Sequence, residues 1–172
     1  MAINFKEITE YLSDTKLQQL KAAYRRTDLG ALGGPPRVVY PPSAPSMDVI
    51  ATAFYASLPD DPGPQPRDTL TVQDRERCLL ALLCARREDI ELAIHIYLAL
   101  MEGIGIREIA NVMLLAGTYT GIDNFNRGLL VEAVTLQALD SMTGDLSLPA
   151  VVQVLAQTFE PHGTAGILNV RQ

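Results

Sequence analysis

The sequence predicts an all-α protein with more apolar helix surface than one small chain can bury. Apolar residues recur at helical spacing from about residue 70 onward, and the alternating pattern of a half-buried strand is nearly absent. Three successive segments, residues 78–85, 90–101 and 109–118, are apolar on nearly every side. Since a surface helix requires only one apolar stripe, these segments favour an oligomer in which neighbouring protomers cover the remaining faces.

The first helical region is expected at residues 4–26. Ser13 or Asp14 can cap a helix that starts inside it, because either side chain can accept a hydrogen bond from a free N–H group of the first turn. The apolar residues of this region are loosely periodic, at Leu12, Leu17, Leu20 and Tyr24. The pattern therefore predicts a short amphipathic helix.

Residues 29–46 contain five prolines and three glycines, a composition that excludes a regular helix. We expect an extended arm there. A short helix is expected at residues 47–58, and the proline-rich stretch at 59–68 ends it. Residues 1–69 together are interpreted as an N-terminal extension.

The main helical domain is expected at residues 70–160. Thr71 followed by Asp74 predicts the start of its first helix, because a hydroxyl cap and an acid three residues later can satisfy free N–H groups in both directions. Pro149 is suited to the first turn of the last helix. The expected helices run through residues 74–85, 88–102, 106–118, 124–139 and 149–159, and the tail at 161–172 is expected to be irregular.

Charge and hydropathy narrow the classes of partner. The net charge is −6, and basic residues cluster no further than pairs, so nucleic acid is not an expected partner. No apolar run is long enough for a membrane span, and the N-terminus lacks the order of a signal peptide, so we expect a cytoplasmic protein. Cys78 and Cys84 are predicted to be buried thiols, neither a disulfide nor a redox pair.

An acid and an imidazole interrupt the most apolar segment, "IELAIHIYLALM" at residues 90–101. Glu88, Glu91 and His95 are spaced three and four residues apart, so one side of a helix would carry all three. A buried polar group requires a partner or a water-filled cavity. His95 is therefore either a core histidine bonded to a carbonyl or an acid, or a group that faces a cavity, and the two acids can also be solvated residues of a first turn.

The segment "RERCLLALLCARREDIELAIHIYLALMEGIGIREIANVMLLAGTYTGI" resembles the carboxymuconolactone decarboxylase family, which includes the alkylhydroperoxidase (AhpD)-like proteins. The resemblance covers about residues 70–140. It lies in the order and spacing of Arg75-Glu76, Glu91-Leu92, His95, Ala99-Leu100, Gly103, Glu108-Ile109, Tyr119 and Gly121. It implies an AhpD-like helical domain of packed antiparallel helices that assembles as a trimer or hexamer.

The resemblance also implies a set of site residues. In the peroxidase branch a Cys-x-x-Cys pair precedes the histidine, but those positions hold Glu88 and Glu91 here, so thiol peroxidase activity is disfavoured. The remaining groups suit proton transfer next to a carbonyl, as in decarboxylation or isomerisation of a small carbonyl or lactone acid through an enol or enolate. No cofactor is expected. The predicted roles are acid/base for His95, proton relay for Glu76, second carboxylate for Glu91, oxyanion donor for Tyr119 and substrate carboxylate binding for Arg75.

Two alternatives come from other classes of protein. Glu76, Glu88, Glu91 and His95 offer oxygen and nitrogen ligands for a metal, although helical di-iron sites usually repeat a Glu-x-x-His unit that this segment lacks. A non-catalytic helical oligomer could instead keep Glu76 and His95 as a core hydrogen bond. We expect no metal, and we expect a departure from the muconolactone substrate because Asn111 and Asp123 differ from the family pattern.

Overall fold

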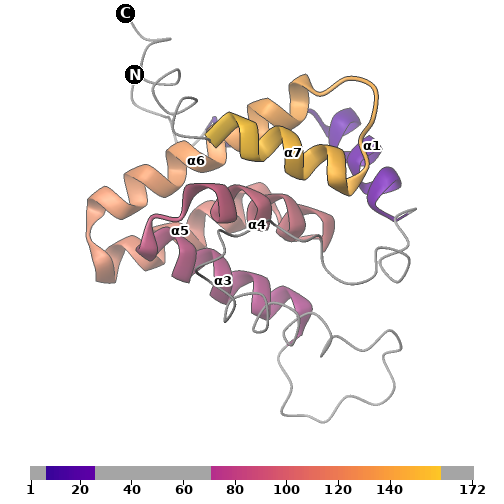
Figure 1. Ribbon diagram of the computed structural model, residues 1–172. Helices are drawn as coiled ribbons and strands as arrows, with labels where there is room; N and C mark the ends of the chain where they lie inside the picture. Colours follow the sequence, from indigo (N-terminus) through magenta and orange to yellow (C-terminus); the bar gives the residue numbers. More distant parts are fainter. Residues whose placement is uncertain (1–6, 26–70, 160–172) are drawn as a thin grey trace, which may run out of the picture.

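The structure is a computed structural model that describes residues 7–25 and 71–159 (Figure 1). All regular secondary structure in these two ranges is helical, which confirms the all-α prediction. The elements are the 3₁₀ helix η1 (Ile8–Glu10) and the α-helices α1 (Asp14–Tyr24), α3 (Val72–Arg86), α4 (Asp89–Met101), α5 (Ile106–Thr120), α6 (Ile122–Ser141) and α7 (Leu148–Phe159). The predicted arm at 29–46, the helix at 47–58 and the tail at 161–172 lie outside the described residues.

Two predicted capping side chains are present. The Ser13 hydroxyl accepts a hydrogen bond from the Lys16 amide at 3.4 Å and caps α1. The Thr71 hydroxyl accepts from the Asp74 amide at 3.1 Å and donates to the Asp74 carboxylate at 2.7 Å, which starts α3. Each bond satisfies an N–H group that the first helical turn leaves free.

The turn from α3 to α4 depends on Arg87, which has a left-handed backbone with φ of 63°. A non-glycine residue in this region is uncommon and needs support from its surroundings. The support comes from its side chain, because Arg87 Nε donates to Asn124 Oδ1 on α6 at 2.7 Å. The side chain thereby ties this tight turn to the start of α6.

Helix α4 lies at the centre of the fold and packs against α3, α6 and α7 (Figure 1). Its buried residues are Leu92, Ala93, Ile96, Tyr97, Ala99 and Leu100. The chain itself therefore covers most of this segment, and self-association is not needed to explain its apolar composition. Apolar side chains stay exposed on α3 and around the end of α5, at Val72, Leu82, Leu114, Leu115, Tyr119 and Ile122.

Helix α1 belongs to the same core as residues 71–159. Ile8, Leu12 and Leu20 are buried together with the apolar residues of the later helices. Ser13 donates from its amide and its hydroxyl to Asp140 Oδ1, at 2.9 and 2.8 Å. The part of the predicted extension that the structure describes is thus integrated in the domain, whereas a boundary near residue 70 stays a prediction.

Cys78 and Cys84 are both free thiols, but only Cys84 is buried. Cys84 Sγ donates to the Asn124 carbonyl oxygen at 3.3 Å. The prediction that Cys78 is buried is wrong, because the side of α3 that carries Cys78 and Leu82 is left uncovered. Within the described residues, no helix combines the length and the apolar character needed to cross a membrane.

Candidate acid/base site

Glu76 on α3 and His95 on α4 form a hydrogen-bonded pair. Glu76 Oε2 lies 2.9 Å from His95 Nδ1, and the side chains are 5% and 15% exposed, respectively. The two helices run antiparallel, because Gln73, one turn before Glu76, donates to the carbonyl oxygen of Glu102, which follows His95 on α4. The contact expected between these two side chains is therefore present at the interface of α3 and α4.

The hydrogen bond of the pair determines which nitrogen of the imidazole can accept a proton. When Glu76 is ionised, Nδ1 must carry the hydrogen of the 2.9 Å bond, which leaves a lone pair on Nε2. An imidazole oriented in this way is a general base at Nε2, and it becomes a general acid once that nitrogen takes up a proton. The His95 side chain is 15% exposed, so the ring is not completely buried.

A second polar group borders the same helix pair. The Tyr24 hydroxyl from α1 donates to Glu102 Oε1 at 3.2 Å, and its ring packs edge-on against Tyr97 with centroids 6.1 Å apart. Burial, followed by the charge of Glu102, raises the pKa of Tyr24 far above the usual phenol range, and burial alone raises the pKa of Tyr97 to about 12. Both phenols are therefore neutral at physiological pH; the Tyr24 hydroxyl is hydrogen-bonded, whereas the buried Tyr97 hydroxyl has no hydrogen-bond partner among the described residues.

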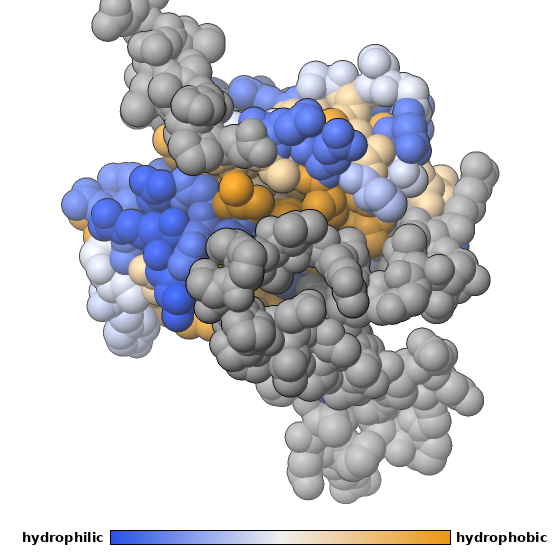
Figure 2. Space-filling model, in the orientation of Figure 1, coloured by the Kyte–Doolittle hydropathy of each residue, from blue (hydrophilic) through white to orange (hydrophobic). Residues whose placement is uncertain are grey.

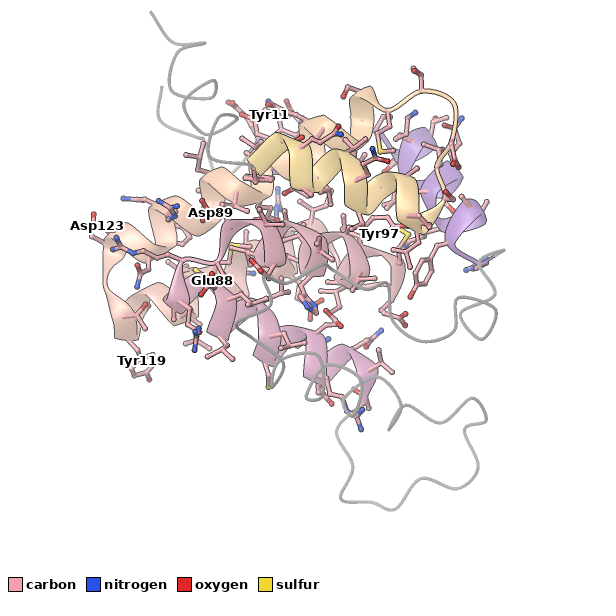
Figure 3. All side chains as sticks on the ribbon, viewed as in Figure 1. Tyr11, Glu88, Asp89, Tyr97, Tyr119 and Asp123 are labelled. Carbon is pink, nitrogen blue, oxygen red and sulfur yellow. The ribbon has the colours of Figure 1, made fainter. Side chains whose placement is uncertain are left out.

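The other predicted acids do not join the pair. Glu88 precedes α4 as its N-cap residue, and its carboxylate lies 3.6 Å from the Arg86 guanidinium (Figure 3). Glu91 is half-buried in the first turn of α4 and has no side-chain hydrogen bond to another described residue. In residues 7–25 and 71–159, no three His, Cys, Asp or Glu side chains converge as ligands for a metal ion.

Tyr119 and Arg75 occupy different surroundings from the pair. Tyr119 is 84% exposed near the end of α5, and Figure 3 shows it projecting away from the bundle. The predicted oxyanion donor is thus not brought to His95 within this protomer. Arg75 is half-buried beside Glu76 in the sequence and already has an interaction within the chain.

A surface depression of about 470 Å³ lies elsewhere, between the end of α6 and α7. It is lined by Ser141, Met142, Thr143, Asp145, Ala150, Gln153, Val154 and Gln157, and it includes neither member of the Glu76–His95 pair. The candidate site therefore lies at the interface of α3 and α4, apart from this depression.

Comparisons of the chain with protein-family models, with curated proteins and with solved structures found no match. A functional argument therefore starts from the arrangement of Glu76 and His95 in the described residues. Sequence reasoning did not find Tyr24 and Glu102 beside this pair, because their contact joins segments 78 residues apart. No spacing rule links residues across such a separation.

Proposed function

We propose that the protein is a cofactor-independent acid/base enzyme that acts on a small carbonyl or lactone acid. The observation that carries the proposal is the 2.9 Å bond between a nearly buried carboxylate and Nδ1 of an imidazole that is itself mostly buried. The sequence resemblance to the carboxymuconolactone decarboxylase family supports the substrate class. The reaction is decarboxylation or isomerisation through an enol or enolate.

Each residue has a defined task in this reaction. In isomerisation, His95 Nε2 removes a proton from the carbon next to the carbonyl, the electron pair passes to the carbonyl oxygen, and the imidazolium returns a proton to another carbon of the conjugated system. In decarboxylation, the electron pair left by carbon dioxide forms the enolate, and the imidazolium protonates its carbon. Glu76 orients the ring and stabilises its charged form in both cases.

Deuterium exchange tests this proposal without knowledge of the natural substrate. In D₂O, the protein is expected to accelerate replacement of C–H by C–D next to the carbonyl in at least one member of a panel of small keto and lactone acids. Proton NMR follows the loss of the C–H signal. His162→Gln is the matched control and should keep the activity, whereas His95→Gln should lose it; equal rates for His95→Gln and wild type with every acid would contradict the proposal.

A non-catalytic role is the second candidate, and the position of the surface depression favours it. The depression between α6 and α7 does not include His95 or Glu76. In this case the pair is a structural hydrogen bond between α3 and α4, and its removal costs about 1–3 kcal/mol of stability because the remaining group is left buried without a partner. Absence of exchange together with a lowered unfolding midpoint for His95→Leu would favour this candidate.

We also propose that the protein self-associates, as a trimer or hexamer. The support is the exposed apolar surface around α5, where Leu115 is 62% and Ile122 is 63% exposed. Leu115→Glu is expected to shift the mass measured by light scattering toward the monomer, because an interface cannot bury an unpaired charge. Gln137→Glu, an exposed polar position in the last part of α6, is the control for an added charge away from this apolar surface. A monomeric wild-type protein at micromolar concentration would contradict the proposal.

A further inference from the structure

Helix α6 carries an acid in the core of the bundle. Glu132 is 0% exposed, and neither of its carboxyl oxygens has a hydrogen-bond partner among the described residues. It lies in the middle of α6, so neither helix end offers it free N–H groups. A buried carboxyl group without a partner is unusual, because burial strongly disfavours the charged form.

Thr135 lies on the same side of α6, three residues after Glu132, and its hydroxyl is also buried without a partner. This hydroxyl differs from those of other helical threonines in the protein. Thr118, Thr120 and Thr158 each donate to the carbonyl oxygen four residues earlier, at 2.8–2.9 Å. Glu132 and Thr135 thus form an apolar-walled polar pair, which we call the α6 polar pair.

Among the described residues, no charged group compensates the burial of the α6 polar pair. Helix α6 packs against α5, α4, α3, α7 and α1, and the buried residues of α5, α7 and α1 are all non-ionisable. On α3, Glu76 is bonded to His95 and Cys84 to a carbonyl oxygen, and Lys16 of α1 donates to the Met142 carbonyl oxygen at 2.6 Å. The ionisable groups on the surrounding helices are Asp14, Lys16, Lys21 and Tyr24 on α1, Asp74, Arg75, Glu76, Arg77, Cys78, Cys84 and Arg86 on α3, Asp89, Glu91, His95 and Tyr97 on α4, and Arg107, Glu108 and Tyr119 on α5. None of them changes the pKa of Glu132 appreciably, and burial is the cause of its shift.

We propose that Glu132 is a proton-sensitive lock of the helical bundle, in which the packed state of α6 binds one proton at this carboxyl that the open state releases. Rising pH then favours release of α6 from α4 and α5. The lock does not depend on the chemistry at His95. It places a response to pH inside the fold, on the helix that packs against the His95-bearing α4.

The direction of the pH dependence follows from burial. Burial raises the pKa of Glu132 well above its usual value of 4.5, whereas the unfolded chain keeps the usual value. Below the unfolded value both states are protonated and the stability is at its maximum. Between the two values only the unfolded state loses the proton, so the folding equilibrium constant falls about tenfold per pH unit. Above the folded value the loss is complete.

The test is denaturant unfolding of the full chain at several pH values from 5 to 8. Wild type is expected to lose up to about tenfold in its folding constant per pH unit from this one proton. Glu132→Gln is expected to remove this part of the pH dependence. Glu10→Gln, which replaces an exposed carboxyl on η1, is expected to retain it. Parallel pH profiles of wild type and Glu132→Gln would overturn the proposal.

Carbon NMR of the wild-type protein gives a second readout, which does not require that any variant folds. The side-chain carboxyl signal of Glu132 is assigned by sequential assignment of the wild type. It is expected to remain at the chemical shift of the protonated acid at pH 6. Titration of this signal in the ordinary range near 4.5 would show an ionised, solvated carboxyl and would overturn the lock.

Discussion

Glu76→Gln is expected to lower the rate of proton transfer by about 10²–10⁴-fold, the range in which positioned acid/base groups contribute. Glutamine has the same shape as glutamate and can still bond to His95 Nδ1, whose distance from Oε2 is 2.9 Å in the native pair. It lacks the negative charge that stabilises the imidazolium, and its amide can donate to Nδ1 and thereby place the hydrogen on Nε2. The rate of C–H to C–D exchange measures the loss.

Controls separate this effect from a change in folding. Glu108→Gln alters a carboxylate that pairs with Arg77 at the surface, and it should leave the exchange rate unchanged. The double variant Glu76→Gln/His95→Gln should be no slower than His95→Gln alone, because the two groups act as one unit. If the rate loss in the double variant equalled the product of the losses in the two single variants, Glu76 would act independently of His95.

A substrate-free measurement tests the same geometry. Nitrogen NMR of the imidazole is expected to show the hydrogen on Nδ1 in wild type and a shift toward the Nε2–H form in Glu76→Gln. The chain has two histidines, so His162→Gln assigns the signals. A wild-type protein whose neutral His95 carries its hydrogen on Nε2 would contradict the proposed base.

The helices were predictable from the sequence because their signals are local. Helix starts at Ser13 and Thr71 follow from side-chain chemistry within one turn, and the bounds of the helices after residue 70 agree with the periodicity to within a few residues. The first α-helix is shorter than the expected region 4–26, because it begins at Asp14. The contact between Glu76 and His95 followed from a resemblance in spacing. Their catalytic role is a proposal, since the arrangement of two residues does not fix a reaction.

Features that depend on which helices meet were not predictable. The amphipathic pattern of residues 124–139 emphasised apolar positions, yet α6 buries Glu132 and Thr135 as well, since several helices surround it. Cys78 is predicted to be buried, but it is exposed, because none of the described helices covers that side of α3. Periodicity tells which residues share a face, and only the packing of the other helices decides whether that face is covered.

Gly117→Val is expected to destabilise the fold by about 3 kcal/mol, at the upper end of the usual cost of overpacking. Gly117 lies on α5 where α6 comes closest, and a Cβ atom there would lie 3.1 Å from the backbone nitrogen of Phe125 and in collision with its Cβ. The two helices are joined through Gly121 alone, so α6 cannot shift away without breaking the turn. Thermal unfolding should show a midpoint lower by about 6–12 °C.

A graded glycine series distinguishes this collision from helix propensity. Gly117→Ala would stabilise a free helix by about 1 kcal/mol because alanine has the higher helix propensity. A net loss of stability in this variant would therefore come from the collision with α6. Gly128→Ala should cost less, because the atoms nearest its Cβ are side-chain sulfur atoms of Cys84 and Met113, whereas at Gly117 backbone atoms of Phe125 are also in the way. Gly105→Ser, at the open N-cap of α5, should be neutral or stabilising. If Gly117→Ala raised the unfolding midpoint, α5 and α6 would have to lie further apart than the fold requires, and the packing that encloses Glu132 would need revision.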